Sequence, residues 1–334
     1  MSSAPPPAPT AQEIIRDARW LAQALEPSSA LVRLIEMSAD DYRAASFLDD
    51  RMLQAPVRSI TRPFAEIAAA IPGDARQDAR WIFHIGHVGS TLVARLLGEI
   101  DGVLAVREPR ILRDLAAAEQ REDFVPAVRK LLSRTFAPDD TALVKATSFV
   151  SEIAAELVPP RERALFLYAQ PRNYIASILA GENSLKELAA LATTRARRMS
   201  DRVHGLSGNT PAHLAAAAWA CEMTSLEAAA EAMPGRDIEW ADFDAMLGDM
   251  EGALLEAAQF FGFATSAHRV WQIATGPLMG RYSKALEFDY SPSLRRDLLE
   301  QEFQLQGRDI DDAVLMLEAA AQRSPLLSRA LARS

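Results

Sequence analysis

Cysteine is scarce in this sequence and acidic residues outnumber basic ones, and each of these features excludes a class of protein. The 334 residues include a single cysteine, Cys221, so neither an intramolecular disulfide nor a cysteine-based zinc site can form, and no metal site is expected. One cysteine also fits a reducing compartment, and we expect a cytoplasmic protein. The formal net charge of −9 argues against a nucleic-acid-binding protein, which needs a basic face for its phosphate contacts.

Long apolar runs are missing as well. The longest, residues 214–221, is far below the roughly 18 to 20 residues that a membrane span requires, so no membrane partner is expected. Residues 1–10 are rich in Ser, Ala and Pro and lack the basic start and apolar core of a secretion signal. We interpret them as a disordered tail. Hydrophobic residues still make up 49% of the chain, which is enough for a large buried core.

The segment 11–75 is predicted to be mainly helical. Apolar residues recur there at helical spacing and predict a first helix over 11–25, namely Ile14, Ile15, Ala18, Leu21 and Leu25. A short apolar run at 31–35 predicts a strand, and a second helix is expected over 40–53 with Ser38 as its cap. We therefore expect an N-terminal helical segment ahead of a main domain that spans 76–334.

From residue 81 onward, predicted strands alternate with predicted helices. Short apolar runs, of the kind found in strands buried on both faces, occur at 81–85, 103–106, 142–145, 164–168 and 238–240. Such alternation indicates βαβ units and a parallel sheet, so the predicted class is α/β with a central parallel sheet and a large helical complement. Residues 181–233 are interpreted as a long helical insertion in this domain.

The turn after the first of these strands is the strongest candidate for a ligand site. In parallel sheets ligands bind at the carboxyl ends of the strands. Gly86 and Gly89 allow the backbone to bend and to approach a ligand, with His87 and Val88 between them. Ser90 and Thr91 then open a helix, whose free N–H groups and positive dipole end favour an anion. The alternative is an ordinary glycine turn between a strand and a helix.

The turn does not match the Walker A pattern of kinases and ATPases. Ser90 stands where a lysine should follow Gly89, and His84 stands where the first glycine should be. That lysine reaches the β and γ phosphates in Walker-type enzymes, so its absence argues against their chemistry.

Residues 83–92, with Arg107-Glu108-Pro109 after them, resemble the sulfotransferase family. In that family the corresponding loop cradles the 5′-phosphosulfate of 3′-phosphoadenosine 5′-phosphosulfate (PAPS). Gly89, Ser90 and Thr91 match its Gly-Thr-Thr, and His87 occupies the place of the usual lysine or arginine. The resemblance implies a P-loop three-layer fold, PAPS as donor, PAP as product, and a small-molecule or peptide acceptor.

Two later segments extend the resemblance. Residues 164–177 are similar to the strand, loop and helix that hold the 3′-phosphate, with Arg172 and Ser177 as the implied contacts. The family usually has a further arginine eight residues before this serine, and here that position is Ala169. Near the C-terminus, a segment similar to the family's basic nucleotide-closing loop offers Arg281, Ser283 and Lys284.

Three residues are candidates for the chemistry. Glu108 follows the second strand and is the candidate base. The alternative is a structural carboxylate that interacts favourably with the positive end of a helix dipole. Lys145 ends the strand at 142–145 and could neutralise charge on the transferred group, or its stem could extend to solvent. His87 could act as a cation, as a base, or as a turn residue bonded to the backbone.

Other charged residues are assigned no chemistry. His84 is interpreted as a core histidine with a satisfied partner. A group of arginines on the helical insertion is interpreted as a solvated helix face, comprising Arg195, Arg197, Arg198 and Arg202.

The function predicted first is therefore a PAPS-dependent sulfotransferase that acts on a hydroxyl or amine. Two alternatives remain open, a non-catalytic nucleotide-binding regulatory protein and a P-loop phosphotransferase without the Walker lysine. The sequence identifies neither the acceptor nor an oligomeric state.

Overall fold

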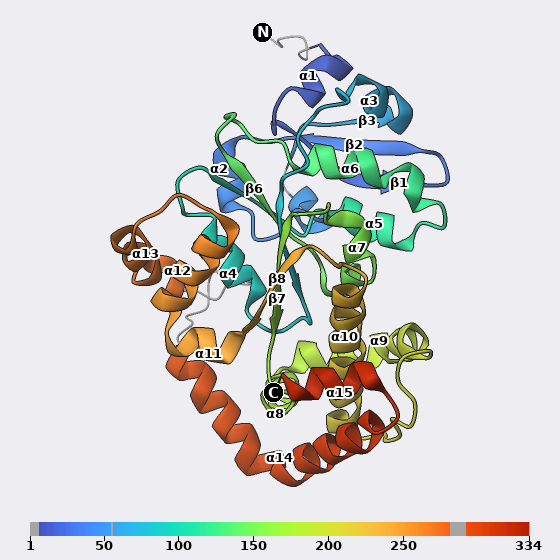
Figure 1. Cartoon of the computed structure of the whole chain (residues 1–334), viewed down its shortest axis with the longest axis vertical. Coiled ribbons are helices and arrows are strands. Elements are labelled where there is room, and N and C mark those ends of the chain that lie inside the picture. The colour runs from blue at the N-terminus through green and yellow to red at the C-terminus, as the bar shows by residue number, and fades with distance from the viewer. Residues whose placement is uncertain (1–6, 55, 281–291, 334) are drawn as a thin grey trace.

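Two β-sheets form the framework of the fold (Figure 1). The computed structural model describes residues 7–54, 56–280 and 292–333. The first sheet is antiparallel, has the order β1-β2-β3, and consists of β1 (Trp20–Glu26), β2 (Leu31–Glu36) and β3 (Ser59–Pro63). The second is parallel, has the order β5-β6-β4-β7-β8, and consists of β4 (Arg80–His84), β5 (Val103–Arg107), β6 (Thr141–Lys145), β7 (Arg163–Tyr168) and β8 (Asp237–Asp242).

The parallel sheet confirms the predicted α/β fold with a central parallel sheet and a large helical complement. All five strands occur where their apolar runs predicted them, and the first four are almost wholly buried. Strand β4 is central, since Trp81 aligns with Val144 of β6 on one side and with Ala164 of β7 on the other. The turn that follows β4 therefore lies at the middle of the sheet.

Helices cover both faces of this sheet and give three layers (Figure 1). On one face α4 (Ser90–Leu97) packs against α12 (Met250–Phe261), and on the other α10 (Pro211–Glu231) packs against β4. The other α-helices between residues 110 and 332 are α5 (Arg110–Ala117), α6 (Val125–Leu132), α7 (Ala154–Leu157), α8 (Pro171–Leu179), α9 (Glu182–Met199), α11 (Phe243–Gly248), α13 (Ala267–Ala274), α14 (Pro292–Ala321) and α15 (Pro325–Ala332). Short 3₁₀ turns are η1 (Asp50–Gln54), η2 (Arg121–Asp123), η3 (Ser148–Ile153) and η4 (Pro277–Gly280).

The N-terminal segment is not mainly helical, and the helix predicted over 11–25 is wrong beyond its first turns. Helix α1 (Ala11–Ile15) ends early, and residues 20–26 form β1. Trp20, Leu21 and Ala22 are all buried in succession, which a strand covered on both faces achieves and a surface helix does not. Helical spacing could still be satisfied here because residues 20–22 are apolar in succession, and so short a run fits either period.

The rest of this segment follows the prediction in part. Strand β2 confirms the run at 31–35. The helix expected over 40–53 is shorter: α2 (Ala39–Ala44) is capped by Ser38 as expected, but the chain then extends and forms η1. Strand β3 and α3 (Phe64–Ala70) complete the segment. In the predicted tail, residues 1–6 lie outside the described residues, while Pro9 and Thr10 are ordered by hydrogen bonds to Arg62 and Glu13.

A buried arginine fastens the N-terminal segment to the parallel sheet. Arg107, at the end of β5, donates to the backbone carbonyls of Tyr42, in the last turn of α2, and of Ala45, its C-cap. Burial lowers the pKa of this guanidinium to about 10. Leu48 N–H also donates to Arg107 O at 2.8 Å, and Arg110 N–H donates to Leu48 O at 3.4 Å. The loop between α2 and η1 is thereby held against the strand end that carries Glu108.

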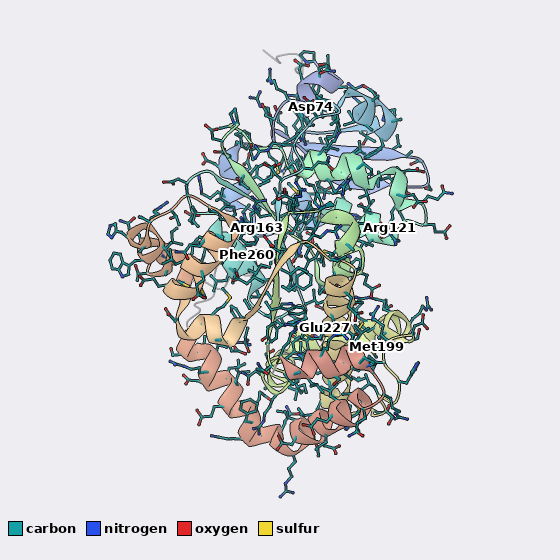
Figure 2. All side chains as sticks on the ribbon, viewed as in Figure 1. Asp74, Arg121, Arg163, Met199, Glu227 and Phe260 are labelled. Atoms are coloured by element: carbon teal, nitrogen blue, oxygen red, sulfur yellow. The ribbon has the colours of Figure 1, made fainter. Side chains whose placement is uncertain are left out.

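The two C-terminal helices, α14 and α15, both pack against α10. Glu227 of α10, labelled in Figure 2, has a buried side chain that accepts from Arg329 of α15 and from Arg333, the C-cap of that helix. Helix α14 bends at Gln306, where the backbone leaves helical values, and so follows the curved edge of the molecule in Figure 1. Within the described part of the chain, no helix combines the length and the apolarity needed to cross a membrane.

Candidate functional site

The turn between β4 and α4 has the geometry expected of an anion-binding turn. Gly86 and Gly89 have φ values of 79° and 59°, which favour glycine. Gly89 is the N-cap of α4 and has no side chain to cap the helix, so the first N–H groups of α4 face the turn. A Cβ at Gly89 would lie 1.9 Å from the Phe243 ring, so glycine is required there by space as well. The position predicted for residues 86–91, at a helix start after a central strand, is confirmed.

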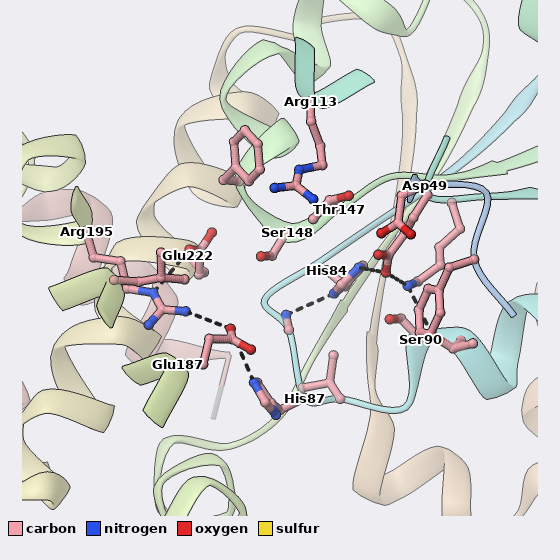
Figure 3. Close-up of a pocket in the computed structure, with 18 of the residues that line it drawn as sticks. Asp49, His84, His87, Ser90, Arg113, Thr147, Ser148, Glu187, Arg195 and Glu222 are labelled. Carbon is pink, nitrogen blue, oxygen red and sulfur yellow. Dashed lines mark hydrogen bonds and ion pairs between the residues drawn. The ribbon is translucent and has the colours of Figure 1, made fainter. Parts of the chain in front are cut away.

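This turn lines a cavity of about 640 Å³, a volume typical of small-ligand sites. The three candidates for chemistry, Glu108, Lys145 and His87, line the same cavity. Figure 3 shows this cavity and labels His87. Other walls come from the N-terminal loop and η1, from the start of η3, and from α9 and α10. Strand ends that are far apart in the sequence thus converge at one edge of the sheet, as its topology requires.

Glu108 and Lys145 form a largely buried ion pair that touches the turn. Lys145 Nζ donates to Glu108 Oε1 and to Thr91 Oγ1, the latter at 3.2 Å. The Lys145 side chain is 1% exposed and that of Glu108 is 12% exposed. Glu108 Oε2 also lies 3.4 Å from Arg51 Nη2. Lys145 therefore connects the acidic group to the helix start where an anion would bind, and its stem does not extend to solvent.

Glu108 has a backbone conformation that side chains rarely adopt. Its φ is +50°, and its N–H donates to Lys145 O at 2.8 Å, which continues the β5–β6 ladder past the strand end. His87 also has a positive φ, of +54°. Left-handed non-glycine residues cost free energy and cluster at functional sites. Of the four that the described residues contain, these two line the cavity.

Arg51 and Asp49 form the wall nearest Glu108. Arg51 donates to both carboxylate oxygens of Asp49, at 2.8 Å and 2.6 Å, and stacks on the ring of Phe47. Burial works against the charge on Asp49, but the hydrogen bonds from Arg51 outweigh it and lower the pKa of this carboxyl. Asp49 thus stays ionised and holds Arg51 beside Glu108. This pair was not predicted from the sequence, because an acidic and a basic residue close together in a loop do not by themselves indicate a ligand site.

His84 has both ring nitrogens engaged, as a core histidine should. Gly86 N–H donates to its Nδ1 at 2.9 Å, so the proton of the neutral ring is on Nε2, which donates to Ala146 O at 2.9 Å. The interpretation of His84 as a core residue is confirmed, and the ring also orients the first amide of the turn. Nε2 lies 3.9 Å from Glu108 Oε1, so His84 borders the ion pair as well.

His87 points from the turn toward α9 rather than toward Glu108 (Figure 3). Its Nε2 is 3.7 Å from Glu187 Oε1, and its Nδ1 is 3.4 Å from Ser184 Oγ. The ion pair with Glu187 forms when the ring is protonated. His87 therefore couples the turn to the helical wall of the cavity.

Arg195 and Arg198 are not on a solvated helix face, and that interpretation is wrong for both. Each lines the cavity, and Arg198 makes a bidentate pair with the buried Glu222 of α10 at 2.7 Å and 3.1 Å. Burial opposes the charge of Arg198, yet its hydrogen bonds to Glu222 raise its pKa. Arg202 pairs with Glu152 and Arg197 is exposed. Arg195 and Arg198 are three residues apart, which places them on one face of α9, and this spacing was the usable signal.

The residues implied for the 3′-phosphate do not line this cavity. Arg172 pairs with Asp311 of α14 at 3.2 Å, and its guanidinium lies over the Phe303 ring. Ser177 Oγ donates to Tyr174 O within α8. Ala169 is fully buried under α10, and its carbonyl accepts from Trp219 Nε1, so this position has no room for an arginine. Arg281, Ser283 and Lys284 lie outside the described residues.

Comparison with known proteins gives a weak likeness to two solved structures. No family model matches the chain, and no curated protein matches it in sequence. A sulfotransferase domain from the curacin biosynthetic pathway is 11% identical, with a TM-score of 0.44 over 67% of this chain and 89% of that one. The mouse sulfotransferase SULT7A1 in complex with PAP is 12% identical, with a TM-score of 0.42 over 78% and 90%. At these values the function has to be argued from the site itself.

Proposed function

We propose that this chain is a sulfotransferase-like enzyme that transfers a sulfuryl group from PAPS to a hydroxyl or amine of an acceptor. The observation that supports the proposal best is one side chain, Lys145. Its ammonium contacts Glu108, the proposed base, and Thr91, at the helix start of the anion-binding turn. A base and an anion site joined by a buried cation are the parts that transfer of a charged group requires.

The turn fits the 5′-phosphosulfate end of PAPS. Residues 86–91 would hold it: Gly89 leaves the space that a Cβ would fill, and α4 directs uncapped N–H groups into the turn. Ser90 and Thr91 add hydroxyl groups at the helix start. When bound, PAPS would supply an activated sulfuryl group with a phosphate as its leaving group.

The proposed roles of the side chains follow from their contacts. Glu108 would accept the proton of the acceptor, because its carboxylate lines the cavity and is held by Lys145 and Arg51. Lys145 would hold positive charge beside the turn, where negative charge accumulates during transfer. His87 is proposed as a further cation at the turn, held against α9 by Ser184 and Glu187.

Binding of the 3′-phosphate of PAPS would require a rearrangement of Arg172. Arg172 would have to leave Asp311 to contact a 3′-phosphate, and its side chain, 53% exposed, is accessible enough to do so. If it does not, the same turn suits a donor without a 3′-phosphate, as in a phosphotransferase. The present pairing of Arg172 is the observation that keeps this second candidate open.

Ligand-dependent stability tests the proposal and its alternatives. The melting temperature is measured with PAP, PAPS, AMP, ATP and GTP, because a ligand that binds only the folded state must raise it. PAP and PAPS should raise it most in the natural protein and much less in Lys145→Ala. Lys186→Ala is the matched control, since Lys186 pairs with Glu182 on the exposed face of α9.

Transfer of labelled sulfate from PAPS to an acceptor panel is then measured. Stabilisation by ATP alone contradicts the sulfotransferase and favours a phosphotransferase. Stabilisation by PAP without transfer to any acceptor favours a regulatory nucleotide-binding protein.

A further inference from the structure

Nearly every charged side chain that lines the cavity forms an ion pair with a side chain of opposite charge. The five carboxylates that line it all form ion pairs, namely Asp49, Asp50, Glu108, Glu187 and Glu222. Arg51, Lys145, Arg195 and Arg198 are the cations in those or neighbouring pairs. Among the residues that the structure describes, Arg113 is the one lining cation without a hydrogen bond or ion pair. Its charge helps to lower the pKa of Asp49, but it forms no hydrogen bond or ion pair with that carboxylate.

Arg113 extends from α5 into the cavity. In Figure 3 its guanidinium points toward Thr147 and Ser148 and lies across the cavity from His87. Arg113 is the fourth residue of α5, which begins two residues after Glu108. Arg113 and Glu108 therefore come from the same strand end, that of β5 at the edge of the sheet.

The hydroxyl of Thr147 is a second group that lacks a partner. Thr147 Oγ1 is buried, lines the cavity and makes no hydrogen bond to any described residue. Thr147 also stands at the N-cap of η3, where a threonine hydroxyl normally accepts from the backbone, and it does not do so here. Buried hydroxyl groups without a partner are rare, which suggests that this one has a ligand.

The sheet order separates these two groups from the donor. The turn follows β4, Thr147 follows the neighbouring strand β6, and Glu108 and Arg113 follow β5 at the sheet edge. A ligand that extends from the turn along this order meets the end of β6 with Thr147 first and then the end of β5 with Arg113. Phe47, Phe149 and Leu191 add apolar surface to the same cavity.

We propose that Arg113 and Thr147 form an anion subsite for the acceptor. The acceptor is then an amphipathic organic acid, with an apolar body and a carboxylate or similar oxyanion in addition to the hydroxyl or amine that is modified. A guanidinium and a hydroxyl together match the acceptor-only oxygens of such an anion. This inference rests on the proposed function, because that function decides which side of Glu108 the donor occupies.

Binding of paired probes to the PAP-saturated protein tests the subsite. The probes are 3-(4-hydroxyphenyl)propanoate and 12-hydroxydodecanoate, each compared with its primary amide by isothermal titration. Each acid should bind about tenfold or more tightly than its amide, as expected for a charge-assisted hydrogen bond. Arg113→Gln and Thr147→Val should reduce that ratio, with Arg113→Gln bringing it close to one.

PAP affinity and a control variant separate this inference from the proposed function. Arg296→Gln removes the same charge from an exposed position of α14 and should leave both the ratio and PAP affinity unchanged. Arg113→Gln should also leave PAP affinity unchanged. Equal binding of acid and amide in both pairs overturns the subsite, and so does a loss of PAP affinity in Arg113→Gln, which would assign Arg113 to the donor. A natural protein that does not bind PAP contradicts the proposed function instead.

Discussion

Replacement of Lys145 by methionine should destabilise the protein strongly, independently of any effect on activity. Methionine keeps the apolar stem and removes the ammonium, so Glu108 keeps its charge at a largely buried position with Arg51 as its remaining partner. Breaking a buried ion pair by removing one partner costs about 3 to 5 kcal/mol. Because Arg51 stays 3.4 Å from Glu108 Oε2, we expect the lower value, about 3 kcal/mol.

The size of this effect can be checked in two ways. At roughly 2 °C for each kcal/mol in a chain of this size, the melting temperature should fall by about 6 °C. In urea, the unfolding midpoint should fall with little change in slope. As a control, Lys186→Met breaks a pair with Glu182 in which both side chains are mostly exposed, so it should cost about 0.5 kcal/mol or less.

The double variant Glu108→Gln with Lys145→Met separates stability from function. Removing both charges leaves no uncompensated ion, so most of the lost stability should return. PAP binding and sulfuryl transfer should not return, because the cation and the base are both gone. The argument is refuted if Lys145→Met costs less than about 1 kcal/mol, or if the double variant is as unstable as the single one.

The remaining predictions concern the base, the nucleotide and the cysteine. Glu108→Gln alone should lower kcat about 10² to 10⁴-fold and leave PAP affinity nearly unchanged; full turnover in a sulfate-transfer assay would assign the base to another residue. PAP should bind about tenfold more tightly than AMP, and Arg172→Ala should remove that preference; equal calorimetric affinities would mean that Arg172 stays with Asp311. Burial raises the pKa of Cys221 to about 12, so iodoacetamide at pH 8 should label the unfolded protein and spare the folded one. Since the folded pKa exceeds the usual value of 9.0, this thiol also makes folding less favourable as the pH rises above that value, and rapid labelling of the folded protein would contradict its burial.

The parallel sheet could be predicted because its sequence signal is local. Each strand is a short apolar run, and the glycine turn after 81–85 marks the sheet edge at which ligands bind in parallel sheets. The first strand of the N-terminal sheet was wrongly predicted as a helix. The apolar run at residues 20–22 fits either element, and only its burial in the folded protein shows that it is a strand. Length and periodicity alone cannot settle such short runs.

Site residues located at the ends of strands could be predicted from the sequence. Those whose place in the site depends on an ion pair between two helices could not. Glu108 and Lys145 were predicted from their positions after strands, and the structure brings them together. Arg198 was misjudged because its partner, Glu222, is on the next helix, and no local pattern indicates which helix faces meet. Thr147 and Arg113 were missed for a related reason, since what distinguishes them is that the side chain of neither makes a hydrogen bond or ion pair with another described residue.

The turn lacks the Walker lysine, but a different lysine, Lys145, places its ammonium beside the turn. In Walker-type enzymes the cation is part of the turn, whereas here Ser90 occupies that position and the nearest buried ammonium comes from β6. A lysine in the turn can follow the phosphates of its nucleotide. Lys145 is instead fixed between Thr91 and Glu108, with 1% of its side chain exposed. In the proposed reaction its charge would act on the reacting group and on the base together. Such a fixed charge needs no reorganisation during transfer, which is the property that electrostatic catalysis depends on.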